Sequence, residues 1–305
     1  MLTVASLTAR QLRARLAGPG IRFQTGPFII SVRSSIASVA EGIALMYADH
    51  PLRDDSPFAD FELDVVRPRS LRRWFRPQVE FVSNGEPVFE PLPLAQAFPM
   101  FEWGMNWCIS SRAHTHLIIH AAVVERDGLA AILPAPPGSG KSTLCAALVN
   151  NGWRLLSDEL ALVRVSDGML VPVPRPVGLK NASIDIVRAY VPGAAISRAV
   201  KDTTKGTVAH LRAPAASVGR AHELARPGWI IFPTYTAGAA PQLAPLRRID
   251  AFQQLAENAF NYSVLGAQGF DTLGGIVERC DSYSFNYSRL DDALAAFASL
   301  GARAA

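Results

Sequence analysis

A glycine-rich turn between two apolar runs is the feature that most constrains this chain. The apolar run 129–133 leads into Pro136-Pro137-Gly138-Ser139-Gly140-Lys141-Ser142-Thr143, and Asn151-Gly152 supplies a stop signal behind the helical spacing of 142–149. A third short run then ends in Asp158-Glu159. A strand, a glycine-rich turn and a helix in this order predict an α/β fold with a phosphate-binding loop of the Walker A pattern.

The predicted loop offers an anion site at the start of a helix. Unpaired amide groups at a helix N-terminus converge on an anion, and the helix dipole adds partial positive charge there. Lys141 would reach the β- and γ-phosphates of ATP as a point charge, and the Ser142 hydroxyl would bind Mg²⁺. The residues expected to bind the nucleotide are Gly138, Ser139, Gly140, Lys141, Ser142 and Thr143.

One position departs from the pattern, because Ala135 stands where the first glycine is expected and Pro136-Pro137 follow it. A positive φ costs alanine about 1–2 kcal/mol, and a residue before proline is pushed toward extended geometry. We therefore expect the loop entrance to differ from the common form, with amide donors mainly from Gly138 to Thr143. The alternative is a glycine- and proline-containing turn in which Gly140-Lys141-Ser142 occurs by chance.

Length and composition place the chain among globular proteins. Its 305 residues are enough for two domains, and 49% hydrophobic with 18% charged residues is far from the composition of disordered chains. The cysteines Cys108, Cys145 and Cys280 are far apart, which favours buried thiols in a reducing compartment over a metal set or a disulfide framework. No apolar run reaches the roughly 18 residues of a spanning helix. Because arginines also interrupt the N-terminal segment, a cytoplasmic protein without membrane contact is expected.

The net charge of +4 is mildly basic. One group of arginines surrounds Trp74 and Phe75: Arg67, Arg69, Arg72, Arg73 and Arg76. Aromatic residues among arginines are one form of a nucleic-acid or acidic-partner surface, but solvated arginines on a loop are the favoured interpretation. Nucleic acid is therefore not the partner that we expect.

The first hundred residues predict a small α+β domain. An amphipathic helix is expected at Thr8–Ala17. Strands are expected in three apolar or alternating runs: 28–32, 43–47 and 61–66. The Asn84-Gly85 dipeptide after the alternating run 79–83 predicts a hairpin with a type I′ turn. Residues 1–95 are assigned to this domain, whose role the sequence does not indicate.

The rest of the chain predicts a connecting helix and a larger domain. The helix is assigned to 96–116 and the P-loop domain to 117–305. Beyond the acidic pair, strands are expected at 160–165, 170–173, 229–235 and 282–287, and helices at 181–190, 249–260 and 291–300. The polar segment 199–208 is interpreted either as a lid over bound phosphate or as an ordinary surface loop.

The acidic pair follows the strand after the loop helix, at the side where ligands gather in open α/β sheets. Adjacent residues of an extended segment point opposite ways, so Asp158 and Glu159 are expected to play different roles. Asp158 is the candidate ligand of Mg²⁺ or of its bound water, and Glu159 is the candidate base for an attacking hydroxyl. The opposite assignment fits the spacing equally, and the alternative for both is a pair of exposed capping acids.

The segment 117–160 resembles the HPr kinase/phosphorylase family, bacterial P-loop kinases that phosphorylate a serine of the HPr carrier protein. The likeness rests on His120 as the end of a strand, on Gly140-Lys141-Ser142, on a helix ending at Gly152 and on Asp158-Glu159. By itself, a lone histidine in an apolar run is interpreted as a buried core residue. The resemblance implies that His120 and Lys141 are catalytic, that the serine binds Mg²⁺ and that the second acid is the general base.

Several features depart from the family. The family has Asp-Asp at the acidic pair, glycine at Ala135 and no double proline, and its N-terminal domain does not resemble residues 1–95. Its later glutamate- and arginine-rich segment, which supplies a second Mg²⁺ ligand and supports phosphorolysis, has no clear counterpart near 173–181. Reversal by inorganic phosphate is therefore expected to be weak or absent. The whole chain is more similar to the HPr-kinase-related proteins found with peptide-modification gene clusters, some of which phosphorylate peptides.

These features predict an ATP- and Mg²⁺-dependent kinase that transfers the γ-phosphoryl group to a serine- or threonine-type hydroxyl of a protein, a peptide or a small molecule. The residues expected to act are His120, Lys141, Asp158 and Glu159, with Ser142 and Asp158 at the metal. The resemblance also implies a homo-oligomer. The alternative is an ATP-binding regulatory or partner protein without a phosphoryl acceptor, which the departures around Ala135 keep open.

Overall fold

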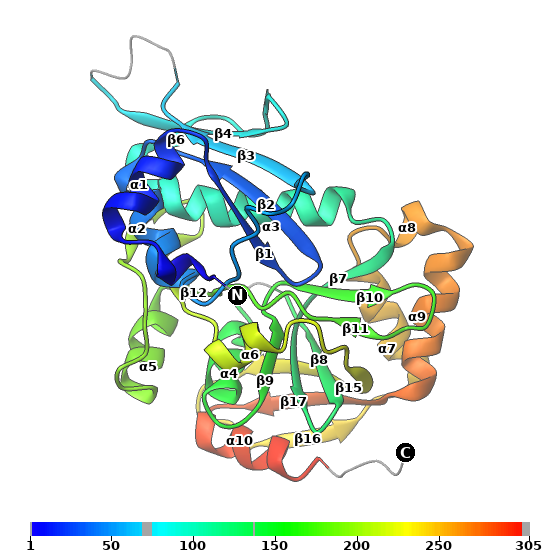
Figure 1. The fold of residues 1–305 in the computed structure, drawn as a ribbon. Coiled ribbons are helices and arrows are strands. Elements are labelled where there is room, and N and C mark those ends of the chain that lie inside the picture. Colours follow the sequence, from blue (N-terminus) through cyan, green and yellow to red (C-terminus); the bar gives the residue numbers. More distant parts are fainter. Residues whose placement is uncertain (1, 69–74, 137, 301–305) are drawn as a thin grey trace.

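A computed structural model describes residues 2–68, 75–136 and 138–300 of the chain. Two large β-sheets, a small third sheet and surrounding helices form a mixed α/β fold (Figure 1). The α/β class expected from the sequence is confirmed at this level. Three arginines of the predicted cluster, the tryptophan among them and the second proline of the loop lie outside the described residues: Arg69, Arg72, Arg73, Trp74 and Pro137.

The first sheet has the order β1-β2-β3-β4-β5, and β6 pairs with β4. Its strands are β1 (Ile21–Thr25), β2 (Phe28–Arg33), β3 (Phe61–Val66), β4 (Gln78–Ser83), β5 (Glu86–Pro87) and β6 (Leu92–Pro93). The helices of this part are η1 (Val4–Ser6), α1 (Ala9–Ala17), α2 (Ala37–Met46), η3 (Leu94–Gln96) and α3 (Ala97–Arg112). Helix α1 begins where Thr8 and Gln11 form a reciprocal capping box, which satisfies amide groups at the helix start.

Local signals predicted most of these elements, but one prediction was wrong. The turn residues Asn84 and Gly85 have φ of 51° and 85°, the left-handed pair that a type I′ turn requires. Residues 43–47, expected as a strand, instead form the end of helix α2 and the residue after it. The buried α2 residues recur at three- and four-residue spacing, which a short apolar run does not distinguish from a buried strand: Val39, Ala40, Ile43 and Met46. The assignment of 1–95 as a separate domain stays a prediction.

The second sheet has the order β11-β10-β7-β8-β15-β17-β16, and β9 pairs with β7. Its strands are β7 (His116–Arg126), β8 (Leu129–Pro134), β9 (Arg154–Ser157), β10 (Leu160–Arg164), β11 (Leu170–Val171), β15 (Arg226–Tyr235), β16 (Gln242–Pro245) and β17 (Asp281–Tyr287). Strand β7 is antiparallel to β8 and to β9. Strands β8 and β9 therefore run in the same direction, and their carboxyl ends meet at one edge of the sheet.

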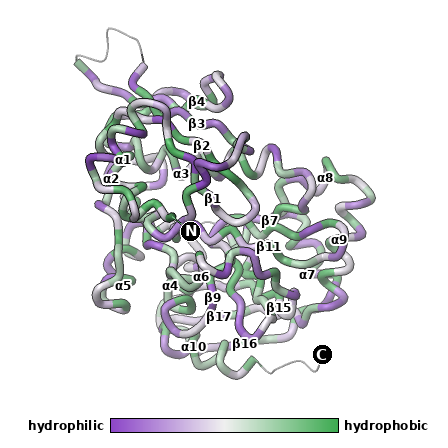
Figure 2. The backbone as a smooth tube through the Cα atoms, viewed as in Figure 1, coloured by the Kyte–Doolittle hydropathy of each residue, from purple (hydrophilic) through white to green (hydrophobic). Residues whose placement is uncertain are grey.

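Helices cover both faces of this sheet. One face carries α4 (Lys141–Val149) and α10 (Leu290–Ala298), and the other carries α7 (Arg248–Glu257) and α9 (Ala267–Arg279), with α8 (Tyr262–Leu265) beside them (Figure 1). In β7, Ala122 and Val124 pack toward α4, while Ala121 and Val123 pack toward α7 and α9. Burial on both faces explains why these strands are continuous apolar runs. Figure 2 shows hydrophobic segments where the elements pack and hydrophilic segments at outer turns.

The third sheet has the order β12-β14-β13 and lies beside the acidic pair Asp158-Glu159. Its strands are β12 (Val177–Lys180), β13 (Val200–Thr203) and β14 (Gly206–Leu211), and the neighbouring helices are α5 (Ala182–Tyr190) and α6 (Ala215–Gly219). The segment 199–208, expected as a loop or lid, therefore forms most of a β-hairpin. The interpretation of this segment as a lid over bound phosphate stays a prediction.

The two large sheets share one hydrophobic core. The cluster beneath the first sheet and α3 also contains residues of the second sheet and of the segment after it: Ile118, Leu160, Leu162, Val171 and Val173. Within the described residues, the structure contains no helix with the length and apolar character needed to cross a membrane.

Candidate functional site

Strand register brings the predicted site residues to one place. Pro134, at the end of β8, lies opposite Ala121, and Ser157, at the end of β9, lies opposite Val123. His120 is the last residue of β7 that pairs with β10, where it lies opposite Leu160. The sequence predicted His120 at the end of a strand, but the structure places it within β7. Its neighbour Ala121 pairs with the last residue of β8, so His120 lies beside the carboxyl ends of β8 and β9.

The glycine-rich turn leads directly into helix α4. Gly140 is the N-cap with φ of 89°, and Leu144 N donates to Gly140 O over 2.9 Å. A Cβ at Gly140 would lie 2.6 Å from the Tyr287 hydroxyl, so this position excludes larger residues both by its φ and by its neighbours. Ala135 is buried and does not have a positive φ, which explains why the loop entrance tolerates alanine.

Three polar groups lie in contact at the start of α4. Lys141 is buried, and its Nζ lies 3.1 Å from His120 Nε2. His120 Nε2 also lies 3.0 Å from Glu159 Oε2. A neutral imidazole nitrogen either donates or accepts, so Nε2 serves one of these two partners at a time. Burial favours a raised pKa for Glu159, but the hydrogen bond from His120 and the charges of Lys141 and Lys180 hold the pKa of Glu159 below its usual range.

Asp158 is buried beside this triad. Its Oδ2 accepts from Gly178 N over 3.0 Å, whereas its Oδ1 is buried without a hydrogen-bond partner among the described residues. Burial and the negative charge of Glu159 raise the pKa of Asp158 to about 6, although Lys141, Gly178 and Ser142 act in the opposite direction. An unpartnered, buried carboxylate oxygen next to a hydroxyl is an arrangement that a bound cation would satisfy.

The two acids approach the same region, contrary to the sequence expectation. They form a bend between β9 and β10, not an extended segment. A Cβ at Gly178 would lie 3.7 Å from Glu159 Oε1 and 3.9 Å from Asp158 Oδ2, so oxygens of both carboxylates border one small volume. The alternation rule fails here because it holds only for extended backbone.

The acidic pair also lines a pocket that sequence reasoning did not identify. Its other polar lining residues come from β9, from α3, from the segment before β12 and from the third sheet: Ser157, Glu102, Trp103, Asn106, Arg175, Lys180, Lys205 and His210. Trp103 lies in the segment assigned to the connecting helix, and Lys205 belonged to the segment interpreted as a lid or loop. The other lining residues carried no recognisable motif, because helix, strand and turn positions far apart in sequence converge only in the fold.

The structure thus places His120, Lys141, Asp158, Glu159 and the described loop residues 138–143 around one end of the second sheet. Within the described residues there is no group of three or more histidine, cysteine, aspartate or glutamate side chains that could hold a metal ion by themselves. A scan against protein-family models and a search of curated proteins both found no match to this chain.

Proposed function

We propose that this chain is an ATP- and Mg²⁺-dependent kinase of the P-loop type that phosphorylates a serine- or threonine-type hydroxyl. The observation that carries the proposal is the contact chain from Lys141 Nζ to His120 Nε2 to Glu159 Oε2, with steps of 3.1 and 3.0 Å. It joins the helix N-terminus, where phosphate would bind, to a carboxylate that can accept a proton.

The reaction follows from these positions. An acceptor hydroxyl beside Glu159 would give its proton to that carboxylate while its oxygen attacks the γ-phosphorus of ATP. The bond from this phosphorus to the bridging oxygen of ADP breaks, so a phosphate ester and ADP are formed. Lys141 and the loop amides would neutralise the charge that develops on the transferred group. His120, with Nε2–H toward Glu159, would hold that carboxylate in place.

Mg²⁺ fits the oxygen ligands at the acidic pair. Asp158 Oδ1 is buried without a partner among the described residues, and Ser142 provides a hydroxyl beside the same carboxylate. Two protein ligands suffice, because Mg²⁺ is commonly held by one or two carboxylates together with substrate phosphates and water. When bound, the metal would neutralise charge on the phosphate oxygens.

The proposed type of kinase is HPr-kinase-like, on the strength of the resemblance in 117–160. The contact of the histidine with the second acid supports this part of the proposal, because it is the contact that a histidine supporting a general base requires. Reversal by inorganic phosphate remains expected to be weak. The corresponding segment, 173–181, contains no carboxylate that could bind a second metal ion. Its Arg175 is bound to Glu102.

Replacing the proposed base tests the function. The full chain is incubated with γ-labelled ATP, Mg²⁺ and a peptide library or lysate, and the transferred label is quantified. We expect Glu159→Gln to slow transfer by about 10²–10⁴-fold with unchanged affinity for Mg²⁺–ATP, and Lys141→Met to weaken both. Glu62→Gln, an exposed change on β3, is the matched control.

The same assay separates the alternative role as an ATP-binding regulatory protein. In that case the label would stay on the nucleotide or appear as inorganic phosphate, and no acceptor would become labelled. Full transfer by Glu159→Gln would reject Glu159 as the base, and full transfer by Lys141→Met would reject the site as a whole.

A further inference from the structure

A pocket that opens to solvent lies between α3 and the third sheet. Asp158, Glu159 and Gly178 form part of its wall, but none of the described loop residues 138–143 lines it. The glycine-rich loop and the pocket are therefore neighbours that meet at the acidic pair. A molecule in the pocket can therefore present an atom to Glu159.

One of the three permanent cations in this wall is already neutralised. Arg175 donates to Glu102 Oε2 over 2.7 Å and to Glu102 O over 2.9 Å, and it also donates to Asn106. Burial lowers the pKa of His210, so that imidazole adds no charge near neutral pH. The remaining cations of the wall are Lys180 and Lys205.

The charge of Glu159 acts on both lysines, but from beyond ion-pair distance. Within the described residues neither forms a salt bridge, and the Lys205 ammonium instead lies 5.4 Å from the centre of the Trp103 ring. Partial burial, together with the charge of Lys180, lowers the pKa of Lys205. Two like charges that act on each other are an arrangement that a bound anion stabilises.

Helix α3 supplies an aromatic ring and an amide to the wall. Trp103 offers an aromatic surface and Asn106 an amide, and both lie opposite the lysine-bearing sheet. The sheet is held near α3 by the hydrogen bond from Gln96 Nε2 to Asp202 O, 3.0 Å long. The pocket thus combines two cations, one aromatic surface and a proton acceptor.

We infer that this pocket binds the phosphoryl acceptor and that Lys180 and Lys205 hold an anionic group, carboxylate or phosphate, which the acceptor carries beside its hydroxyl. This inference rests on the proposed function. The hydroxyl oxygen gains the γ-phosphoryl group, its proton passes to Glu159 and ADP leaves, while the anionic group is unchanged. The two lysines would make the pocket selective for a charged acceptor, and α3 would control the access of that acceptor to the pocket.

The test compares probes that differ in charge and share a primary hydroxyl. The full chain is saturated with Mg²⁺ and a non-hydrolysable ATP analogue, which fills the loop, and is then titrated by calorimetry. One pair is N-acetyl-L-serine and its neutral amide, and the other is glycerol phosphate and glycerol. We expect the anion of at least one pair to bind at least about tenfold more tightly, and the pair that shows it identifies carboxylate or phosphate.

Substitution of the lysines makes the test specific. Lys180→Met and Lys205→Met keep the aliphatic stems and should each reduce the preference to about threefold or less. Lys201→Met is the matched control, because Lys201 is exposed on the same hairpin and does not line the pocket. Circular dichroism and an unchanged affinity for the ATP analogue verify that each variant is folded.

The outcomes separate this inference from the proposed function. If the ATP analogue does not bind, the proposed function fails. If it binds but the charged and neutral probes bind equally, or neither binds, the inference is overturned while the nucleotide site stands. A preference that survives in both lysine variants also overturns it, because the anion would then be held elsewhere.

Discussion

At the scale of single residues, His50 shows how burial fixes a protonation state. Its ring is buried against Tyr47 and Phe23, and its Nε2 lies 3.2 Å from Pro174 O, to which it donates. Its Nδ1 is buried without a partner in the described part of the chain. A proton on Nδ1 would therefore add a charge and an unsatisfied N–H to the core. Accordingly, burial lowers the pKa of His50 from 6.5 to about 4.

This shift predicts a loss of stability in mild acid. Below pH 6.5 the unfolded chain binds a proton at His50 that the folded chain refuses, so the contribution is full above pH 6.5 and is lost as pH falls toward 4. We expect the stability advantage of the native chain over His50→Leu to shrink by about 2 kcal/mol between pH 7.5 and pH 5. Urea unfolding at both pH values measures it. A gap that does not change with pH would contradict the assignment.

Single residues also mark the limit of prediction from sequence. The turn at Asn84-Gly85 could be assigned because a hairpin turn depends on a few neighbouring residues. Lys141 could be placed because a spacing pattern accompanies it. Arg175 and Lys180 could not, because a pocket residue acquires its role from side chains that folding brings together from distant segments.

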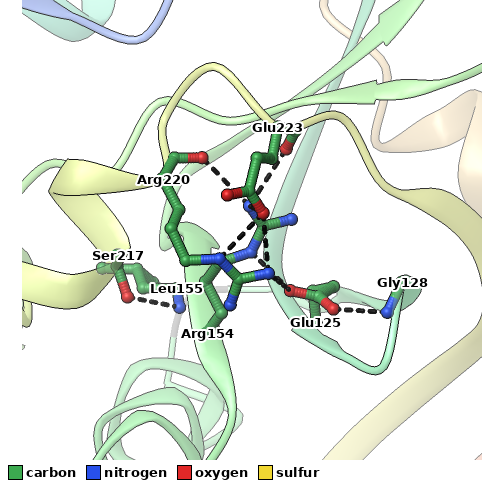
Figure 3. A network of polar contacts seen from close by, with 7 residues as sticks. All are labelled: Glu125, Gly128, Arg154, Leu155, Ser217, Arg220 and Glu223. Carbon is green, nitrogen blue, oxygen red and sulfur yellow. Dashed lines mark hydrogen bonds and ion pairs between the residues drawn. The ribbon is translucent and has the colours of Figure 1, made fainter.

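At the scale of elements, a buried ionic network fastens the β7–β8 hairpin to β9 and to the segment after α6 (Figure 3). Arg154 of β9 donates to Glu125 of β7, and the two side chains are only 5% and 2% exposed. Glu125 also accepts from Gly128 N over 2.6 Å, and Arg154 donates to the carbonyl groups of Arg220 and Glu223. Strand β9 carries the acidic pair at its end, so this network fixes the strand that positions it.

Neutralising one member should destabilise the fold. In Glu125→Gln, the side chain keeps its shape while the Arg154 guanidinium loses its buried counter-charge, so we expect a loss of about 3 kcal/mol. Denaturant unfolding measures the change. The control is Asp250→Asn in the exposed pair with Arg247, where side chains are 32% and 80% exposed and a much smaller loss of stability is expected because solvent screens the pair. Equal losses in the two variants would contradict a special role for burial.

Helices and strands were predicted well where the length of an apolar run or its neighbours distinguished helical from strand spacing. The strand, turn and helix order of 129–149 was confirmed, and so was the strand before the acidic pair. The strand expected at 43–47 failed because five apolar residues fit a strand and a buried helix equally. The bend at Asp158-Glu159 could not be foreseen, since the turn from β9 to β10 depends on the pairing of both strands with β7.

At the scale of the whole molecule, the first sheet and the second are joined through α3. Glu102 of α3 accepts from Arg175 over 2.7 Å and from the Tyr47 hydroxyl over 2.8 Å. These side chains are buried, and the hydrophobic core around them includes residues of β7 and β10. Because α3 also lines the pocket beside Glu159, the packing of the two parts determines the shape of the proposed acceptor site.

A shared core and a buried ion pair predict that the two parts unfold together. In Glu102→Gln, Arg175 would keep its charge without a counter-charge, at a cost of about 3 kcal/mol. Hydrogen exchange in native conditions should then show an equal loss of protection in β2 and β3 of the first sheet and in β8 and β15 of the second. The control is Asp49→Asn, which also joins the two parts through Arg212, but with side chains 28% and 30% exposed, and should cost at most about 1 kcal/mol.

The pattern of protection decides between one cooperative unit and two. If Glu102→Gln lowered protection only in β2 and β3, the first part would open while the second stayed folded, and α3 would not couple them. If protection fell equally in all four strands, any change that loosens α3 would also alter the pocket beside Glu159. Acceptor binding would then depend on residues far from Lys180 and Lys205. Those distant residues would affect nucleotide binding at the loop only through global stability.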